Sequence, residues 1–172
     1  GNDVIIEGAG TDSIDGGDGS DTYTADLATD VVTETNATLA TGGNDLVNFI
    51  GTTGTFTLAA NIERLTLGGT SAISGKGNAL ANTLIGNGAD NSLNGMTGKD
   101  TLTGGLGADK FVFHTALGAA EVDDIVDFTR TQGDKIQLDN GIMAALGIPG
   151  ALGTQFYGAA GAANGNDAND HI

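Results

Sequence analysis

Residues 83–113 read TLIGNGADNSLNGMTGKDTLTGGLGADKFVF, and this stretch decides the fold. Its large apolar residues are nine positions apart, and its turn-type residues Asn91, Asp100 and Asp109 keep the same step, with glycines between them. An α-helix needs apolar residues three and four positions apart, so this step predicts a short strand followed by a tight turn. The apolar series is Leu84, Leu93, Leu102 and Phe111.

Two such units make one coil of about 18 residues, with each apolar side chain pointing inward. Glycines suit the turns because the backbone angles there are ones that side chains resist. A flexible glycine-rich linker is the alternative interpretation. A linker, however, would not keep a large apolar residue in register with an Asp over four units.

Residues 1–33 repeat the pattern. Their aspartates are nine apart, and an apolar residue follows each one by two positions. Glycine stands two positions before the first three aspartates, whereas Ala28 replaces it before the fourth, where the motif decays. The aspartates are Asp3, Asp12, Asp21 and Asp30, and the apolar residues are Ile5, Ile14, Tyr23 and Val32.

The clearest unit, residues 104–112 (GGLGADKFV), fits the nonapeptide G-G-x-G-x-D-x-U-x, and residues 16–21 (GGDGSD) fit its turn. The chain therefore resembles the RTX, or haemolysin-type, calcium-binding repeat family. This resemblance implies an all-β fold, a right-handed parallel β-roll. In that family each turn supplies two backbone carbonyls and one Asp carboxylate, and stacked turns share an ion. Two turns then supply six oxygens, close to what Ca²⁺ requires.

The resemblance implies that ligands pair across two nonapeptide units, which is one full coil. Asp3 pairs with Asp21, Asp12 with Asp30, Asn82 with Asp100, and Asn91 with Asp109. An Asn contributes a carbonyl oxygen without charge, so the last two sites are expected to be weaker, and Asp90 is an alternative to its neighbour Asn91. The expected metal ligands of the repeats are Gly1, Asp3, Gly8, Gly10, Asp12, Gly17, Gly19, Asp21, Asn82, Asn91, Gly98, Asp100, Gly105, Gly107 and Asp109.

Residues 34–82 have fewer glycines and acids but keep the coil length, and Gly43 begins what reads as another turn and strand. Val47, Leu65 and Leu84 follow one another at intervals of 18 and 19. On the other side of the coil we expect Phe56, Ile73 and Leu93 to be the inward residues. They follow one another at intervals of 17 and 20. The sequence predicts that the solenoid continues here without calcium.

Residues 114–138 resemble the D-x-I-x-D-F…G-D-K-I-x-L segment that follows the last repeat of RTX proteins. The resemblance implies two capping strands and terminal calcium ligands at Asp127 and Asp134, with Asp124 as a further candidate. We expect residues 1–138 to form the roll with its cap. Residues 139–172 are expected to hold a short helix over 139–147 and a partly ordered tail that is truncated.

The formal net charge is −16, and 18 of the 22 acids are Asp, which suits ligands carried on turns. Such a charge disfavours nucleic acid as a partner, since phosphates would be repelled. No apolar run is long enough to span a bilayer. The chain starts at Gly1 within a G-x-D turn, so we expect it to begin inside a larger repeat array.

We therefore predict a non-catalytic module that binds several Ca²⁺ ions and folds on binding them. The resemblance implies a larger bacterial RTX protein secreted by a type I pathway to the cell surface or medium. A catalytic interpretation of Asp123, Asp124 and Asp127 lacks a partner acid or base. Two alternatives stay open: a structural, adhesive or self-associating module, and a polysaccharide-binding module of an extracellular enzyme, although the six cationic residues are scattered in the sequence.

Overall fold

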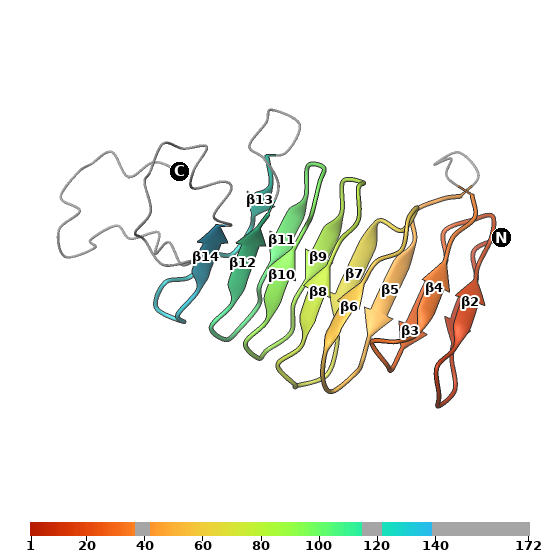
Figure 1. Ribbon diagram of the computed structural model, residues 1–172, viewed down its shortest axis with the longest axis horizontal. Coiled ribbons are helices and arrows are strands. Elements are labelled where there is room, and N and C mark those ends of the chain that lie inside the picture. Colours follow the sequence, from red (N-terminus) through yellow and green to blue (C-terminus); the bar gives the residue numbers. More distant parts are fainter. Residues whose placement is uncertain (37–41, 115–121, 139–172) are drawn as a thin grey trace.

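The computed structural model describes residues 1–36, 42–114 and 122–138. Within these ranges the chain forms short strands and no helix, stacked as coils along one long axis (Figure 1). The strands are β1 (Val4–Ile6), β2 (Ser13–Asp15), β3 (Thr22–Ala25), β4 (Val31–Thr33), β5 (Leu46–Phe49), β6 (Thr55–Thr57), β7 (Arg64–Leu67), β8 (Ser74–Lys76), β9 (Thr83–Ile85), β10 (Ser92–Asn94), β11 (Thr101–Thr103), β12 (Lys110–Phe113), β13 (Asp124–Ile125) and β14 (Lys135–Leu138).

Every strand pairing is parallel, and successive strands alternate between two walls. The odd-numbered strands form one seven-stranded sheet in the order β1-β3-β5-β7-β9-β11-β13. The even-numbered wall consists of a two-stranded sheet, β2-β4, and a five-stranded sheet, β14-β12-β10-β8-β6. Each coil therefore contributes one strand to each wall, and the predicted all-β parallel solenoid is confirmed.

The core of the odd-numbered wall contains a continuous ladder of inward side chains that runs from β3 to β11. Tyr23 pairs in register with Val47, Val47 with Leu65, Leu65 with Leu84, and Leu84 with Leu102. All five residues are fully buried. β5 and β7 bury a second apolar pair, Phe49 and Leu67, whereas β9 and β11 each bury one residue. Stacking thus lets a chain poor in large apolar residues form a continuous core.

The inward series on the even-numbered wall differs from the prediction at one position. Phe56 pairs with Gly75, and Gly75 pairs with Leu93, so Ile73 is not the inward residue of β8. A Cβ atom at Gly75 would approach Leu65 Cδ2 to 2.9 Å, so a larger residue here would displace the end of the Leu65 side chain. Ile73 is buried just before the strand, and Gly75 takes its place in the inward series.

Coil length varies where turns carry insertions. Thr22 pairs with Leu46 at an offset of 24, whereas the next pairings along this wall, such as Val47 with Leu65, have offsets of 18 or 19. Thr101 pairs with Asp124, and Lys110 with Lys135, at offsets of 23 and 25. β13 and β14 therefore continue the two walls beyond the last nonapeptide.

The predicted helix over 139–147 lies outside the described residues. Among those that are described, no helix has the length and apolar character needed to cross a bilayer.

Candidate metal centres

The turns on one edge of the solenoid are linked by acidic side chains that accept backbone N–H groups of the preceding coil. Asp21 Oδ1 accepts the Asp3 amide at 2.6 Å, Asp45 Oδ1 accepts the Asp21 amide at 2.7 Å, and Glu63 Oε2 accepts the Asp45 amide at 2.8 Å. The row continues where Asp100 Oδ1 accepts the Asn82 amide and Asp123 Oδ1 accepts the Asp100 amide. These bonds hold successive turns in register.

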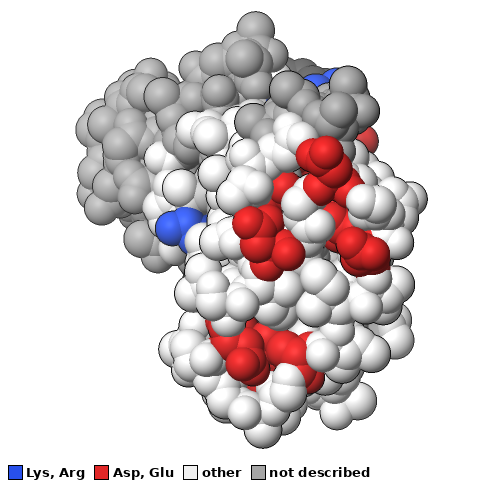
Figure 2. Space-filling view, turned by 90° about the vertical axis from the view of Figure 1, so that its right-hand side faces the viewer, with Lys and Arg blue, Asp and Glu red and all other residues white. Residues whose placement is uncertain are grey.

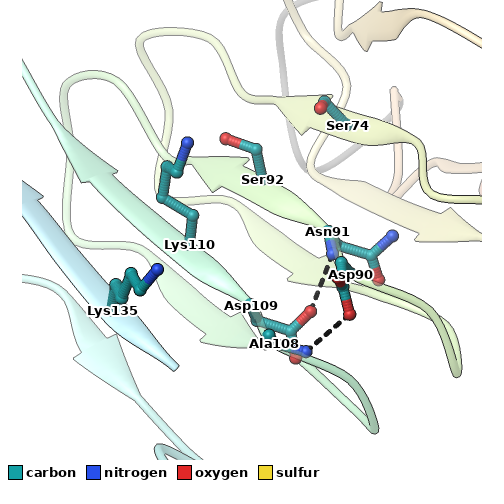
Figure 3. A pocket seen from close by; sticks show the side chains of 8 residues that line it. All are labelled: Ser74, Asp90, Asn91, Ser92, Ala108, Asp109, Lys110 and Lys135. Carbon is teal, nitrogen blue, oxygen red and sulfur yellow. Dashed lines mark hydrogen bonds between the residues drawn. The ribbon is translucent and has the colours of Figure 1, made fainter. Parts of the chain in front are cut away.

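The opposite edge carries the same arrangement. Asp30 Oδ1 accepts the Asp12 amide at 3.2 Å, Asp109 Oδ1 accepts the Asn91 amide at 2.8 Å, and Asp134 Oδ1 accepts the Asp109 amide at 3.0 Å. The Asn91–Asp109 stack is visible in Figure 3. The residues that the sequence pairs one coil apart are therefore neighbours in space on both edges.

Several repeat aspartates have a second carboxylate oxygen that is buried and has no hydrogen-bond partner. These atoms include Asp12 Oδ2, Asp21 Oδ2 and Asp109 Oδ2. Asp109 is 1% exposed, and a Cβ atom at Gly104 would overlap this oxygen, so the carboxylate lies inside its own glycine turn. A buried charge without a partner is costly, and a cation in the turn would satisfy it. These donors therefore fit the hard, oxygen-binding ion Ca²⁺.

The electrostatics of Asp109 agree with this interpretation. Burial raises the pKa of its carboxyl to about 6, although the hydrogen bond from the Asn91 amide lowers it. The charges of Asp134, Asp127 and Asp90 raise this pKa further. The turn therefore concentrates negative charge that a divalent cation would neutralise.

The two asparagines use their side chains differently from the aspartates. Asn91 Oδ1 accepts the Asn87 amide at 2.7 Å, and its Nδ2 donates to the Ile73 carbonyl at 2.9 Å. Asn82 does the same with the Asn78 amide and the Ile62 carbonyl. An amide group can supply both a donor and an acceptor, whereas a carboxylate accepts only. These side chains link coils by hydrogen bonds, so their role as metal ligands stays a prediction.

Asp90, the alternative to Asn91, is directed toward the next turn. Its Oδ1 accepts the Ala108 amide at 2.8 Å (Figure 3). This bond repeats the one-coil step, one position before the Asn91–Asp109 stack. Asp90 therefore adds a second contact between the same two turns.

Six of the glycines predicted to supply carbonyls adopt positive φ angles that other residues resist. Gly107, at φ 113°, also packs so closely on the preceding turn that a Cβ atom would lie 2.7 Å from the Ala89 oxygen. Gly1 and Gly8 are the two predicted glycines outside this group. The positive-φ glycines are Gly10, Gly17, Gly19, Gly98, Gly105 and Gly107.

The predicted terminal ligands lie against the last repeat turns. Both carboxylate oxygens of Asp127 accept amides, from Gly104 and Gly105, each at 2.8 Å. The second oxygen of Asp134 accepts the Thr129 amide at 2.6 Å. Both acids thereby attach the segment after residue 121 to the Asp109 turn, and their role as metal ligands stays a prediction. Asp124 is exposed on β13, and its neighbour Asp123 holds the position in the carboxylate row.

Sequence reasoning missed two acidic clusters at the N-terminal end. In each, one carboxylate oxygen per residue lies within 4.8 Å of the others. Figure 2, which looks onto this end, shows acidic side chains in separate upper and lower groups. Glu7 and Glu34 fall outside the nine-residue count, and Asp45 follows Asp21 by 24 positions. The G-x-D signature of residues 43–45 was the available signal. The clusters are Glu7, Asp26, Asp30 and Asp21, Glu34, Asp45.

Comparison with protein families matches the two glycine- and aspartate-rich blocks. The model of the RTX calcium-binding nonapeptide repeat fits four copies, over residues 1–32 and 76–111. These blocks are RTX calcium-binding repeats. The chain thus carries an RTX array on both sides of a middle region, and the stacked turns described above are its turns. A search of curated proteins gave no match.

Proposed function

We propose that this chain is a calcium-dependent folding module of a larger secreted RTX protein. One observation carries the proposal: buried, unpartnered carboxylate oxygens, such as Asp109 Oδ2, lie inside turns that stack on one another. Calcium binding follows from the RTX repeats themselves. The proposal adds three statements to calcium binding: folding is coupled to it, the chain is exported by a type I pathway, and its role is non-catalytic.

Coupling of folding to calcium has a direct physical basis. Stacking brings carboxylates together, and burial raises the pKa values of Asp45 and Asp109 to about 6 in each case. Near neutral pH these groups are charged and oppose the fold until a cation neutralises them. Ligand assembly and folding are then one event. Extracellular calcium modules bind at about 10⁻⁴–10⁻³ M, so the chain stays open in the cytosol and folds outside.

The test is circular dichroism of the full chain in chelator and in millimolar Ca²⁺, with Mg²⁺ as a matched divalent control. We expect strand signal and a cooperative thermal transition in Ca²⁺ and their loss in chelator. The same strand signal and melting temperature in both conditions would overturn the coupling. Equilibrium dialysis in the same samples counts the bound ions, and a count of zero would overturn calcium binding.

Two alternative roles stay predictions: a structural, adhesive or self-associating module, and a polysaccharide-binding module. For the second, the structure supplies residues to test. Lys110 and Lys135 pair in register and line a hollow of about 320 Å³ together with Ser74, Ser92 and Asp90 (Figure 3). Retention of the chain on an anionic polysaccharide gel, and its loss in Lys110→Ala, would support that role. Calcium-dependent light scattering would support self-association.

A further inference from the structure

The turn between β4 and β5 departs from the repeat at its first position. Glu34 follows β4 as Gly16 follows β2, because Asp15 pairs with Thr33. At Gly16 a Cβ atom would overlap the Asp21 carboxylate and the Tyr23 hydroxyl, so the position faces the inside of the roll. One coil later the same inward position carries a carboxylate.

Glu34 completes a buried group of three acids. One carboxylate oxygen each of Asp21, Glu34 and Asp45 lies within 4.8 Å of the others. The three residues are 1%, 5% and 1% exposed. They come from two consecutive turns, since Asp21 ends the turn after β2 and Asp45 ends the turn after β4.

Each acid in this cluster has one oxygen hydrogen-bonded and one without a partner. Asp21 Oδ1 binds the Asp3 amide, Asp45 Oδ1 binds the Asp21 amide, and Glu34 Oε1 binds the Asn36 amide. The other oxygens, Asp21 Oδ2, Glu34 Oε2 and Asp45 Oδ2, are buried without hydrogen bonds. The free oxygens are therefore available to one common ligand.

Tyr23 supplies an independent observation. Its side chain is fully buried, and its hydroxyl has no hydrogen-bond partner, although the Gly16 amide lies close by. A Cβ atom at Gly16 would lie 2.1 Å from this hydroxyl and 2.4 Å from Asp21 Oδ2, so both oxygens face the same space. The hydroxyl thus adds a fourth unused oxygen beside the three acids.

We propose that Asp21, Glu34, Asp45 and the Tyr23 hydroxyl form a calcium site beyond the nonapeptide repeats. All four donors are hard oxygens, which suit Ca²⁺ and not the nitrogen and sulfur preference of Zn²⁺. Oxygens on opposite sides of Ca²⁺ are separated by about 4.8 Å, the upper limit of the spread in this cluster. The identity of the ion rests on the proposed function.

This site differs from the repeat sites in its donors and its place. Glu34 and Asp45 lie outside the matched repeat blocks, and side chains here stand where a nonapeptide turn supplies backbone carbonyls. Its three carboxylates carry more charge than a repeat pair. The inference also changes the prediction for residues 34–82, since the first coil of that middle region would bind calcium.

Terbium luminescence tests the site directly, because a bound Tb³⁺ ion emits when a nearby tyrosine is excited. The chain has two tyrosines and no tryptophan, so Tyr157→Phe leaves Tyr23 as the single sensitiser. In this background Glu34→Gln is compared with Asp109→Asn, which alters a repeat turn on the opposite edge. Ca²⁺ is counted by equilibrium dialysis in the same variants.

We expect Glu34→Gln to lose one Ca²⁺ per chain and to lower tyrosine-sensitised emission at least about tenfold, as ligand charge sets calcium affinity. Asp109→Asn should lose calcium and keep the emission. Unchanged calcium count and emission in Glu34→Gln would overturn the site while leaving the repeat sites intact. No calcium bound by the parent chain would overturn both proposals.

Glu34→Gly is a second variant for the case in which Glu34→Gln does not fold, because it restores the residue that the repeat has at this position. We expect this variant to fold in Ca²⁺ and to bind one ion fewer than the parent. A folded Glu34→Gly with the full calcium count would also overturn the site.

Discussion

Asn91 and Asp109 occupy equivalent positions in consecutive turns, and the Asn91 amide donates to Asp109 Oδ1 at 2.8 Å. Their side chains nevertheless make different interactions. Asn91 Nδ2 donates to the Ile73 carbonyl of the preceding coil, whereas Asp109 Oδ2 is buried without a partner. We therefore expect the asparagine amide to replace by hydrogen bonding a cation that would lie beside an aspartate. On this hypothesis the Asn91 turn is held together without metal, and the Asp109 turn depends on it.

Asn91→Asp should convert a metal-independent turn into a metal-dependent one. The change removes the donor to the Ile73 carbonyl and adds a buried charge, so we expect about 1–3 kcal/mol lower stability in chelator. In saturating Ca²⁺ the variant should recover stability, because the new pair has two carboxylates. Thermal unfolding in the two conditions measures the difference.

Asn48→Asp is the matched control, since it adds the same charge on the outward side of β5. It should change stability little in either condition. Equal losses of stability for both variants in chelator would show that total charge, and not the Asn91 hydrogen bond, sets the response.

Asp109→Asn is the reciprocal change. Its amide would relieve the buried charge and could donate within the turn as Asn91 does. We expect a higher melting temperature in chelator and a smaller increase on adding Ca²⁺ than in the parent chain. A lower melting temperature in chelator, with the calcium increment unchanged, would contradict the proposed exchange of cation for amide.

The regular part of the fold follows from sequence because each nine-residue unit carries its own signals. Apolar residues such as Leu84 and Leu102 mark the strands, and Asp109 with its glycines marks a turn. Strict spacing then fixes which residues stack, as the Asn82–Asp100 contact shows. In this part, local pattern and long-range pairing contain the same information.

Where a turn carries an insertion, the spacing in the sequence no longer predicts which residues stack. Asp45 stacks on Asp21 at an offset of 24, and Asp123 on Asp100 at 23, because turns of different length return the chain to the same register. Nothing periodic marks those offsets. Glu34 was missed for a related reason: its importance comes from replacing an inward glycine, which is visible only once β2 and β4 are paired.

Without calcium, the fold should lose stability as pH rises from about 5 to 8. Burial, with further contributions from Asp30 and Asp26, raises the pKa of Glu7 to about 7, and the pKa values of Asp45 and Asp109 are raised to about 6. Folded-state pKa values above those of the unfolded chain mean that the folded state binds more protons. Stability is then greatest at low pH and falls as these groups ionise.

Melting temperatures in chelator across this pH range measure the effect, and Glu7→Gln should flatten part of the slope. With Ca²⁺ present the trend should reverse, since calcium ligands must be deprotonated to bind. A metal-free melting temperature that rises with pH over the same range would contradict the assignment of these raised pKa values.

Gly107→Ala should destabilise the roll, because the turn needs both the positive φ angle and the absence of a side chain. At φ 113° an alanine is strained, and its Cβ atom would lie 2.7 Å from the Ala89 oxygen of the preceding turn. Backbone strain of this kind costs about 1–3 kcal/mol, and the clash adds to it. Thermal unfolding in saturating Ca²⁺ isolates this loss from any change in the response to chelator.

Gly88→Ala is the control for that change. Gly88 also lies in a repeat turn, but its φ is not positive and no atom lies within 4 Å of a Cβ placed there. We expect its melting temperature to match that of the parent chain. A similar fall in both variants would mean that glycine acts through general chain flexibility, and the close stacking of Gly107 on Ala89 would then not be what holds successive turns together.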